Sequence, residues 1–561
     1  MRVFAAFAAL VLLFGSRAAG LITAEQASAP TLSFTDEAAT AGLTAFRHVG
    51  GSTPDKRYIP EVMSGGVCAA DFDRDGWSDL LFVNGGSFES AAGKASPPPH
   101  GLFRNTGGGK FANVLERSGI RNAGWGMGCA VADYDNDGDP DIYLTNFLAP
   151  NQLWRNDGDW RFTDVSGSSG TAGPRGRWNT AATFGDYDGD GRLDLFVAGY
   201  AHLDPAALPE PADTPDCRHR GLVVNCGPRG LKGETDLLFR NDGNGTFSGV
   251  TAAIDPKAFY GLGAAFLPLG TDGAVSLYVA NDSTPNALYT FTGKAIDEGA
   301  LAAGAALSEQ GHEQAGMGIG WGDYDADGLI DLYVTNFVDD YNTLYRALRP
   351  QQFEDVTRRA GLAQPTWLSM GWGTAFADFD RDGRDDVIVV NGHVYPQVDS
   401  LELPSKWRMP PQAFRNTGGG RFEEVPRALL PGTAVGRGLA IADFWNDGSV
   451  GVAVNNLDGS PALYRPTATP NRYIGLQLEG TRIPDATGAR VDIRWAGGRA
   501  TRLVVSGGSY LSSHDPRVHV GVGDAKTVDV EVIWPGGGRQ TLRGLETNRL
   551  HRIREAAKKV P

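Results

Sequence analysis

Several common signatures are missing from this chain. After residue 20 no apolar run reaches about 18 residues, the length that a membrane-spanning helix needs, so we expect no transmembrane segment. There is no Gly-x-Ser-x-Gly nucleophile motif and no Gly-x-x-x-x-Gly-Lys phosphate-binding loop. His312-Glu313 is not followed by the second His of a zinc-protease helix. These absences argue against α/β-hydrolases, P-loop proteins and zinc proteases.

Positive charge and cysteine are also scarce. The chain has 51 Lys and Arg against 66 Asp and Glu, a net charge of −15, and we expect no nucleic-acid partner. Of the four cysteines, Cys217 and Cys226 lie in a Pro-rich insertion over 204–234, where a disulfide between them would pin a long loop. Cys68 and Cys129 lie beside Ala and Gly in expected inner strands, and are predicted to be free, buried thiols.

The first twenty residues have the pattern of a signal peptide. Arg2 is followed by an apolar run over 3–14 and then by small residues up to Gly20. No cysteine lies near the expected cleavage region, which argues against a lipoprotein. We therefore expect residues 1–20 to be removed and the protein to be secreted, either to the periplasm or to the outside of the cell.

What the chain does contain is a nine-residue pattern, Asp-x-Asp-x-Asp-Gly-x-x-Asp, at 71–79, 133–141, 186–194, 323–331 and 378–386. Carboxylates at alternate positions, a Gly that allows a sharp turn and a closing acid surround a hard cation with oxygens. An EF-hand closes with Glu at position twelve between helices, whereas here Asp closes at position nine between strand-like flanks. The pattern predicts five Ca²⁺-binding β-hairpin loops. Metal-free polar turns are the alternative, which five copies of one template make unfavourable.

The expected ligands are the side chains at positions one, three, five and nine and the backbone carbonyl at position seven. The carboxylates are Asp71, Asp73, Asp75 and Asp79; Asp133, Asp135, Asp137 and Asp141; Asp186, Asp188, Asp190 and Asp194; Asp323, Asp325, Asp327 and Asp331; and Asp378, Asp380, Asp382 and Asp386. The carbonyls belong to Trp77, Asp139, Arg192, Leu329 and Arg384.

Two further copies of the repeat are damaged. At 268–276 the side-chain ligand positions hold Pro268, Gly270, Asp272 and Ser276, so one carboxylate is left and we expect no calcium. The copy at 443–451 keeps two of its four acids and has Trp445 at a ligand position, so we expect weak binding or none. Five intact and two degenerate units make seven.

Each unit continues with a strand such as 102–105, a Gly-rich turn and a strand such as 110–114. Four short strands in a unit of roughly 40 to 60 residues are typical of a propeller blade. The sequence therefore predicts an all-β, seven-bladed β-propeller over 30–465. The last unit lacks its fourth strand, whereas an orphan copy lies at 32–36. We expect residues 30–44 to complete the last blade and so to protect the sheet edges.

A Pro-containing connector at 465–470 leads to runs that alternate at period two, at 490–495, 501–505, 518–522, 528–534 and 540–543. They predict a small antiparallel β-sandwich over 471–556. Residues 470–561 carry 15 Lys and Arg against 9 Asp and Glu, which is +6 and leaves −21 on the rest of the chain. These basic residues could bind an anionic polymer, dock on the acidic propeller or lie on solvated strand faces.

The Asp-rich repeats resemble the FG-GAP or VCBS repeats of the integrin α-subunit propeller. The tail resembles the ASPIC/UnbV domain in Gly488-Ala-Arg-Val491, Gly508-Ser-Tyr-Leu-Ser512, Val520-Gly-Val-Gly523, Trp534-Pro-Gly-Gly537 and Asn548. With Cys226-Gly-Pro-Arg-Gly-Leu231, this order is similar to the bacterial relatives of cartilage acidic protein over nearly the whole mature chain. Ser513-His514 departs from the family, which more often has Gln after the Ser. The resemblance implies a calcium-bound extracellular propeller and no agreed reaction.

The loops between the second and third strands should emerge opposite the calcium loops. They carry Phe147, Tyr200, His202, Asp282, Phe337, Tyr341, His393 and Tyr395. Aromatic rings beside amide and acid groups suit sugar rings or a protein loop, although the Asn residues of these loops could simply cap turns. The favoured function is a secreted, non-enzymatic, calcium-stabilised scaffold for adhesion to an extracellular protein or polysaccharide. The alternative is a hydrolase or lyase with a pocket at the propeller axis, using His312, His393 and Arg437.

Overall fold

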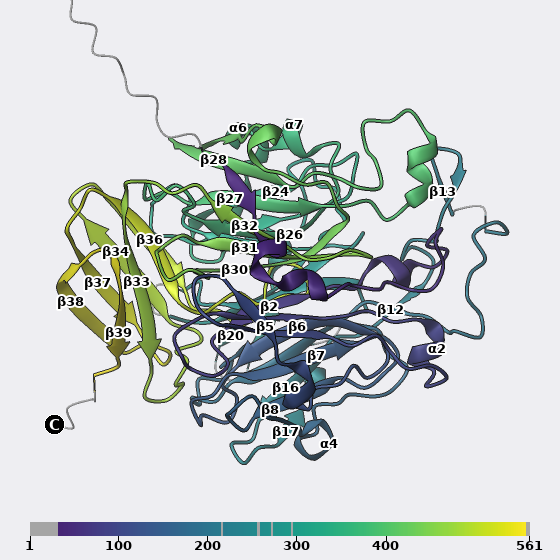
Figure 1. The fold of residues 1–561 in the computed structure, drawn as a ribbon, viewed down its shortest axis with the longest axis horizontal. Coiled ribbons are helices and arrows are strands. Elements are labelled where there is room, and N and C mark those ends of the chain that lie inside the picture. Colours follow the sequence, from purple (N-terminus) through teal and green to yellow (C-terminus); the bar gives the residue numbers. More distant parts are fainter. Residues whose placement is uncertain (1–31, 215–216, 255–257, 271–272, 293–294, 557–561) are drawn as a thin grey trace, which may run out of the picture. The chain divides into compact units, whose positions relative to one another are not determined.

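The computed structural model describes residues 32–214, 217–254, 258–270, 273–292 and 295–556. Strands dominate this part of the chain and the helices are short (Figure 1). No helix among the described residues is long and apolar enough to cross a membrane. The signal peptide predicted at 1–20 lies outside the described residues.

Seven four-stranded antiparallel sheets follow one another along the chain as the blades of a propeller. From inner to outer strand, they are β2 (Val67–Ala70), β3 (Asp79–Phe82), β4 (Gly101–Asn105) and β5 (Phe111–Asn113) in blade 1; β6 (Gly126–Ala132), β7 (Asp141–Asn146), β8 (Gln152–Asn156) and β9 (Phe162–Asp164) in blade 2; β10 (Asn179–Gly185), β11 (Asp194–Gly199), β16 (Leu237–Asn241) and β17 (Phe247–Gly249) in blade 3; β18 (Gly261–Leu267), β19 (Ser276–Asn281), β20 (Ala287–Thr292) and β21 (Ala295–Glu298) in blade 4; β22 (Ile319–Gly322), β23 (Asp331–Val334), β24 (Thr343–Arg349) and β25 (Gln352–Asp355) in blade 5; β26 (Gly371–Ala377), β27 (Asp386–Asn391), β28 (Gln412–Gly418) and β29 (Arg421–Glu424) in blade 6; and β30 (Gly436–Ala442), β31 (Gly451–Asn456), β32 (Ala462–Pro466) and β1 (Phe34–Asp36) in blade 7.

The blades form a closed ring. Their inner strands contact one another in the order β2, β6, β10, β18, β22, β26, β30 and back to β2. As the orphan repeat predicts, β1 pairs antiparallel with β32, with Phe34 opposite Pro466 and Asp36 opposite Tyr464. The seven-bladed propeller is therefore confirmed, and its last blade is built from both ends of the repeat region.

Short helices and two small hairpins complete the propeller. The α-helical turns are α1 (Ala38–Ala41), α2 (Phe88–Ala91), α3 (Leu115–Ser118), α4 (Ser166–Ser169), α5 (Ala300–Ala303), α6 (Thr357–Ala360) and α7 (Ala363–Thr366), and the 3₁₀ turns are η1 (Leu43–Ala45), η2 (Ile59–Val62), η3 (Thr251–Ile254), η4 (Pro396–Ser400) and η5 (Arg427–Leu429). The insertion in blade 3 contains β12 (Ala201–His202) paired with β15 (Lys232–Gly233), and β13 (Arg218–His219) paired with β14 (Leu222–Val223).

The tail forms two packed sheets. One has the order β35 (Gly498–Leu503), β34 (Arg490–Trp495), β37 (Thr527–Ile533), β38 (Arg539–Glu546), and the other β36 (Val518–Gly523), β33 (Arg472–Glu479), β39 (Arg549–Arg554). Their inward residues, among them Ile474, Val491 and Trp534, form one apolar core. The predicted sandwich is confirmed with one correction: β33 and β39 pair in parallel, so the tail is not wholly antiparallel. Neither strand is among the predicted runs; in β39 four of the six residues are Arg or His, which weakens its apolar pattern.

A segment of the tail fills the centre of the ring. The link between β35 and β36 at 506–515, here called the axial segment, contacts the inner strand of every blade. Its hydrogen bonds and bridges reach Ala69 and Val67, Cys129, Thr183, Ala265, Ile319, Thr374 and Ile441. Tyr510 and Leu511 are fully buried. Glycine is required beside it, because a Cβ on Gly66 would lie 2.0 Å from the carbonyl oxygen of Leu511.

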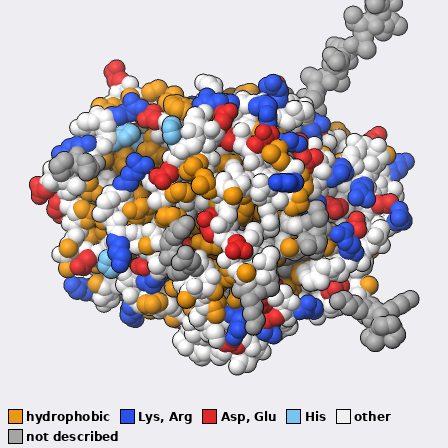
Figure 2. All heavy atoms as spheres, turned by 180° about the vertical axis from the view of Figure 1, so that it is seen from behind, with side chains coloured by type: hydrophobic (Ala, Val, Ile, Leu, Met, Phe, Trp, Pro, Cys, Tyr) orange, Lys and Arg blue, Asp and Glu red, His pale blue; other side chains and the backbone are white. Residues whose placement is uncertain are grey.

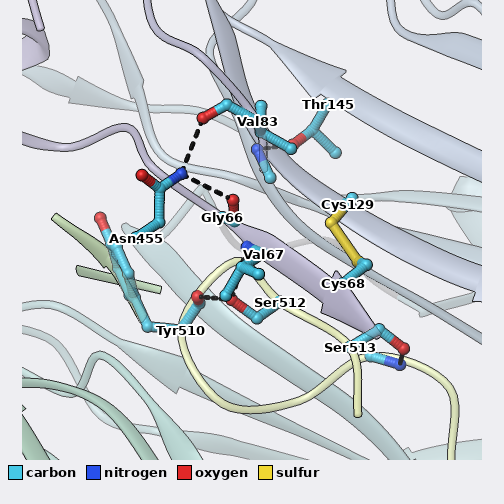
Figure 3. Close-up of a disulfide and its surroundings, with 12 residues drawn as sticks. Gly66, Val67, Cys68, Val83, Cys129, Thr145, Asn455, Tyr510, Ser512 and Ser513 are labelled. Carbon is cyan, nitrogen blue, oxygen red and sulfur yellow. Dashed lines mark hydrogen bonds between the residues drawn. A yellow bond between two sulfur atoms is a disulfide. The ribbon is translucent and has the colours of Figure 1, made fainter. Parts of the chain in front are cut away.

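The structure corrects the prediction for Cys68 and Cys129. They form a disulfide across a sequence separation of 61, with Cα atoms 6.2 Å apart (Figure 3). Each cysteine lies on the inner strand of its blade, β2 or β6, and ring geometry brings neighbouring inner strands together. The pairing was not predicted because the two cysteines are far apart in the sequence. The second predicted disulfide, Cys217–Cys226, is confirmed.

Candidate metal centres and loop-face cavity

The five Asp-rich loops each join the first and second strands of a blade. In every one the carboxylates at positions one, three and nine converge, with one oxygen from each within 4.8 Å of the others. These triads are Asp71, Asp73 and Asp79; Asp133, Asp135 and Asp141; Asp186, Asp188 and Asp194; Asp323, Asp325 and Asp331; and Asp378, Asp380 and Asp386. Blades 1, 2, 3, 5 and 6 thus each contain a group of acids that could hold a metal ion.

Backbone hydrogen bonds hold each triad in place. In the first loop, the Gly76 amide donates to Asp71 Oδ2 at 2.8 Å, and the Phe72 amide donates to Asp79 Oδ2 at 2.9 Å. The other oxygen of Asp79 accepts from the Asn105 amide on the third strand at 2.7 Å. The same three bonds recur in the other four loops. The Gly at position six lets the chain turn with φ near +90°, a conformation that Gly adopts readily.

The carboxylate oxygens left without hydrogen bonds are suitable ligands for a cation. Asp71 Oδ1, Asp73 Oδ1, Asp325 Oδ1 and Asp378 Oδ1 are buried and have no hydrogen-bond partner, although buried carboxylate oxygens normally have one. A hard divalent cation such as Ca²⁺ prefers such oxygen ligands. The position-five acids stand outside the triads, and each accepts the amide of position seven, as Asp75 accepts that of Trp77 at 2.9 Å. The carbonyl ligands predicted at position seven stay predictions.

Without a cation, these carboxyls are costly to ionise. Burial raises the pKa of Asp79 and of Asp194 to about 9 and that of Asp133 to about 8, and neighbouring carboxylates add to the effect. The pKa of Asp386 is also raised well above its ordinary value, first by burial and then by Asp380 and Asp378. A bound divalent cation would reverse this balance by supplying positive charge among the acids.

The degenerate loop of blade 7 keeps the turn of the five loops but not their group of three acids. No metal-binding group is found there among the described residues, and Trp445 is buried with its ring 4.6 Å from the Arg465 guanidinium. Asp443 accepts the Gly448 amide at 2.7 Å, so the turn persists without a triad. In blade 4, Asp272 lies outside the described residues.

The tail docks on the face that carries these loops. Each of the five loops has at least one hydrogen bond to it: Arg517 to the Gly76 carbonyl, the Asp133 amide to Asp485, Arg482 to the Gly189 carbonyl, Arg490 to the Gly328 carbonyl and the Gly521 amide to Asp378. Arg502 also forms an ion pair with Asp385. Of the three explanations for the basic tail, docking on the propeller therefore holds for these arginines.

An Asn on the third strand links adjacent blades, a role that the sequence did not reveal. Asn105 Nδ2 donates to the Ser78 carbonyl in its own loop at 3.1 Å and to the Phe444 carbonyl of blade 7 at 2.9 Å. Asn156, Asn241 and Asn416 make equivalent pairs of bonds. The Arg-Asn motif at the end of this strand was visible in the sequence, but which carbonyls it reaches depends on the ring.

The residues predicted for the opposite face, here called the loop face, differ in their exposure. Phe147, Tyr200, Tyr341 and His393 are buried, so the expectation that they are exposed is wrong for them. Phe147 packs against Trp125 and Trp178 in the core, because loops near the axis are covered by their neighbours. His202 is exposed on β12. Tyr200, Asp282, Phe337 and Tyr395 line one cavity of about 740 Å³.

The blade 3 insertion forms a wall of this loop-face cavity. Cys217, Cys226 and Asn225 all line it. The insertion is anchored on other blades by Asn225 Nδ2, which donates to the Lys56 and Val394 carbonyls at 3.1 and 3.0 Å, and by an Arg220–Asp339 ion pair at 2.7 Å. The disulfide and these contacts place the wall over the centre of the ring.

The three residues of the enzyme alternative do not form a pocket at the axis. Arg437 is fully buried and donates to four carbonyls, those of Val62, Gly392, Gly436 and His393. His393 Nδ1 accepts the Tyr395 amide at 3.0 Å, and its ring packs against His219. His312 is exposed and lines a separate surface cavity of about 930 Å³.

Comparisons with known proteins agree with this architecture. A family model described as an FG-GAP-like repeat matches residues 71–144, 144–197 and 323–389, and the model described as ASPIC and UnbV matches 480–560. Cartilage acidic protein 1 of Mus musculus is 24% identical over 539 residues, which cover 90% of this chain and 75% of the relative. The Homo sapiens protein of the same name is 24% identical over 532 residues, covering 90% of this chain and 73% of the relative.

Among solved structures, BBS1N in its complex with ARL6DN aligns with 76% of this chain and 98% of that chain, at a TM-score of 0.38 and 10% identity. That similarity is too low to carry a conclusion. The repeat and tail matches, together with the relatives, identify this chain as an FG-GAP-repeat β-propeller protein with a C-terminal ASPIC and UnbV domain, similar to cartilage acidic protein 1 over most of its length.

Proposed function

We propose that this protein is a secreted, non-enzymatic scaffold that binds five Ca²⁺ ions and uses its loop face to hold an extracellular protein or polysaccharide. The observation that carries the calcium part is the recurrence, in five blades, of a carboxylate triad with the same backbone bonds. The negative charge of the propeller supports it, because five divalent ions would offset ten of the 21 excess negative charges.

Export supports calcium loading. Two disulfides are typical of proteins that fold in oxidising compartments. Extracellular calcium modules bind with dissociation constants of roughly 0.1 to 1 mM, so such loops fill outside the cytoplasm. The surface seen in Figure 2 mixes positive and negative side chains with apolar ones between them, which suits a protein or an uncharged polysaccharide better than a polyanion.

Equilibrium dialysis against 10 mM calcium, with metal analysis of the protein and buffer compartments, tests the calcium sites. We expect close to five equivalents of calcium in the natural protein and four in Asp141→Asn, which removes one triad carboxylate. The matched control is Asp443→Asn in the degenerate loop of blade 7, which should still hold five. Far fewer than five equivalents, or an equal loss in both variants, would contradict the proposal.

Partner binding is tested on an array of glycans and extracellular matrix proteins at two calcium concentrations. We expect calcium-dependent retention that Phe337→Ala weakens and that Arg543→Ala, an exposed change on the tail, leaves unchanged. Product release from an array spot, or retention lost only in the tail variant, would argue against a binding scaffold that uses the loop face.

A further inference from the structure

We propose that the loop-face cavity binds an organic ammonium group carried on an apolar stem. This deepens the proposed function, because it names the chemistry that one recess of the loop face recognises. A volume of about 740 Å³ lies within the range of roughly 300 to 1,000 Å³ that is usual for small-molecule sites.

Asp282 supplies an acidic anchor that forms no ion pair among the described residues. Its Oδ2 accepts the Tyr200 hydroxyl at 2.7 Å and its Oδ1 accepts the Ser283 hydroxyl at 2.9 Å. Burial raises the pKa of Asp282, and the positive charge of Arg229, which also lines the cavity, lowers it; in the described part of the chain the two residues form no ion pair. A carboxylate held by two neutral donors keeps its charge available for a ligand, and a buried charge without an opposite charge is unfavourable.

Aromatic rings surround the approach to this acid. Tyr200, Phe337 and Tyr395 line the cavity, and the rings of Phe337 and Tyr395 have centroids 6.2 Å apart. Trp372 also lines the cavity, and its indole packs against Tyr510 of the axial segment. The negative faces of aromatic rings attract ammonium groups, and their area accepts an apolar stem. The cavity can therefore contact both the ammonium group and the apolar stem of the proposed ligand.

An independent observation favours a ligand that donates N–H groups. Asn225 lines the cavity, is 2% exposed and has an Oδ1 atom without a hydrogen-bond partner. Its orientation is fixed, since Nδ2 is engaged by two carbonyls. Glu313 and Asp340 line the same cavity, so three carboxylates face one guanidinium, that of Arg229. This excess of negative charge attracts cations and disfavours anions.

Isothermal titration of the calcium-loaded full chain with three probes of one shape tests the proposal. We expect 2-phenylethylamine to bind, 2-phenylethanol to bind at least about tenfold more weakly and phenylacetate not to bind, because the charge of the head group is the only large difference. Equal affinity for amine and alcohol, or binding of phenylacetate as tight as that of the amine, would overturn the assignment.

Variants locate the binding. Asp282→Asn should lower amine affinity at least about tenfold, to the level of the alcohol, whereas Asp213→Asn removes the same charge from an exposed position on the insertion and should bind as the natural protein does. Tyr395→Leu keeps every charge and should weaken both probes, so it tests the cavity even if Asp282→Asn fails to fold. Unchanged amine binding in Asp282→Asn or in Tyr395→Leu would overturn the proposal.

A fourth probe separates the two sources of such a group. Tighter binding of Nα-acetyl-lysine methylamide than of 2-phenylethylamine would assign the ammonium to a protein side chain. Tighter binding of 2-phenylethylamine would assign it to a free amine. Either result supports an ammonium site in the cavity. The array experiment and the amine titration test different claims. Amine binding without array retention would contradict the macromolecular partner but support the ammonium site. Array retention without amine binding would support the partner and contradict the ammonium site.

Discussion

The ring of Tyr510 packs edge-on against the indole of Trp372, with centroids 4.6 Å apart, and the Tyr510 hydroxyl donates to the Met63 carbonyl at 2.5 Å. Tyr510 belongs to the tail, whereas Trp372 lies on β26 of blade 6 and Met63 immediately precedes blade 1. One side chain of the second domain thus joins opposite ends of the repeat region at the axis. The tail is consequently part of the propeller core.

Tyr510→Ala should therefore destabilise the whole protein. Removing a fully buried aromatic side chain leaves a cavity and costs about 3 to 5 kcal/mol of the free energy of unfolding. Tyr510→Phe keeps the ring and loses only the hydrogen bond to Met63, at about 1 kcal/mol. Urea unfolding in calcium measures both, with exposed Leu301→Ala as a neutral control. Propeller unfolding unaffected by Tyr510→Ala would show that the axial contact is not structural.

Calcium removal should lower the melting temperature. At calcium concentrations about 10 to 100 times the dissociation constant, each site contributes about 2 kcal/mol, or on the order of 10 kcal/mol for five sites, which corresponds to a shift of about 10 °C for a chain of this size. Melting curves in EDTA and in 10 mM calcium measure it, and magnesium at the same concentration controls for ionic strength. Superimposed curves would contradict calcium stabilisation.

The two disulfides should differ in their effect on stability. In the chain-entropy account, Cys68–Cys129 closes a 61-residue separation and contributes about 4 kcal/mol, whereas Cys217–Cys226 closes one of 9 and contributes about 2.6 kcal/mol. The paired Ala variants should therefore unfold in that order of urea sensitivity. The shorter bridge also shapes the cavity wall, so its loss should weaken amine binding while loss of the inner bridge does not. Equal amine binding in the two variants would show that the Cys217–Cys226 bridge does not shape the cavity.

Acid should destabilise the calcium-loaded protein between about pH 6.5 and pH 4. Burial lowers the pKa of His100 to about 4 and that of His48 to about 3, from the ordinary value of 6.5. The unfolded chain therefore binds protons at pH values where the folded protein does not, and stability falls as pH falls through this window. At pH 5 each such histidine costs on the order of 2 kcal/mol relative to neutral pH.

His100→Asn tests this pH dependence. Its Oδ1 can replace His100 Nδ1, which accepts the Asn84 amide at 3.0 Å. The free energy of unfolding of this variant, measured by urea at pH 5 and pH 7.5 in calcium, should change less with pH than that of the natural protein. His312→Asn alters an exposed histidine and should leave the slope as it is. An unchanged slope in His100→Asn would rule out a contribution from His100.

Much of this fold could be predicted from local sequence patterns. The nine-residue motif located the turn between the first two strands of five blades, since its ligands lie within one hairpin and their geometry is local. The inner disulfide and the axial segment escaped prediction because both depend on which distant strands the ring brings together. A signal for the axial segment was present: Tyr510 and Leu511 are large apolar residues in a Gly- and Ser-rich link, where solvent exposure would be unfavourable.

The pairing of β1 with β32 also constrains the order of assembly. Phe34 is among the first described residues and its partner Pro466 is 432 positions later. The seventh sheet therefore cannot acquire its outer strand until residue 466 has been synthesised, and residues 506–515 arrive later still. Contacts this distant in sequence slow folding. Nascent chains of this protein consequently expose unpaired strand edges until these residues are available, which makes synthesis the stage at which they most need chaperones.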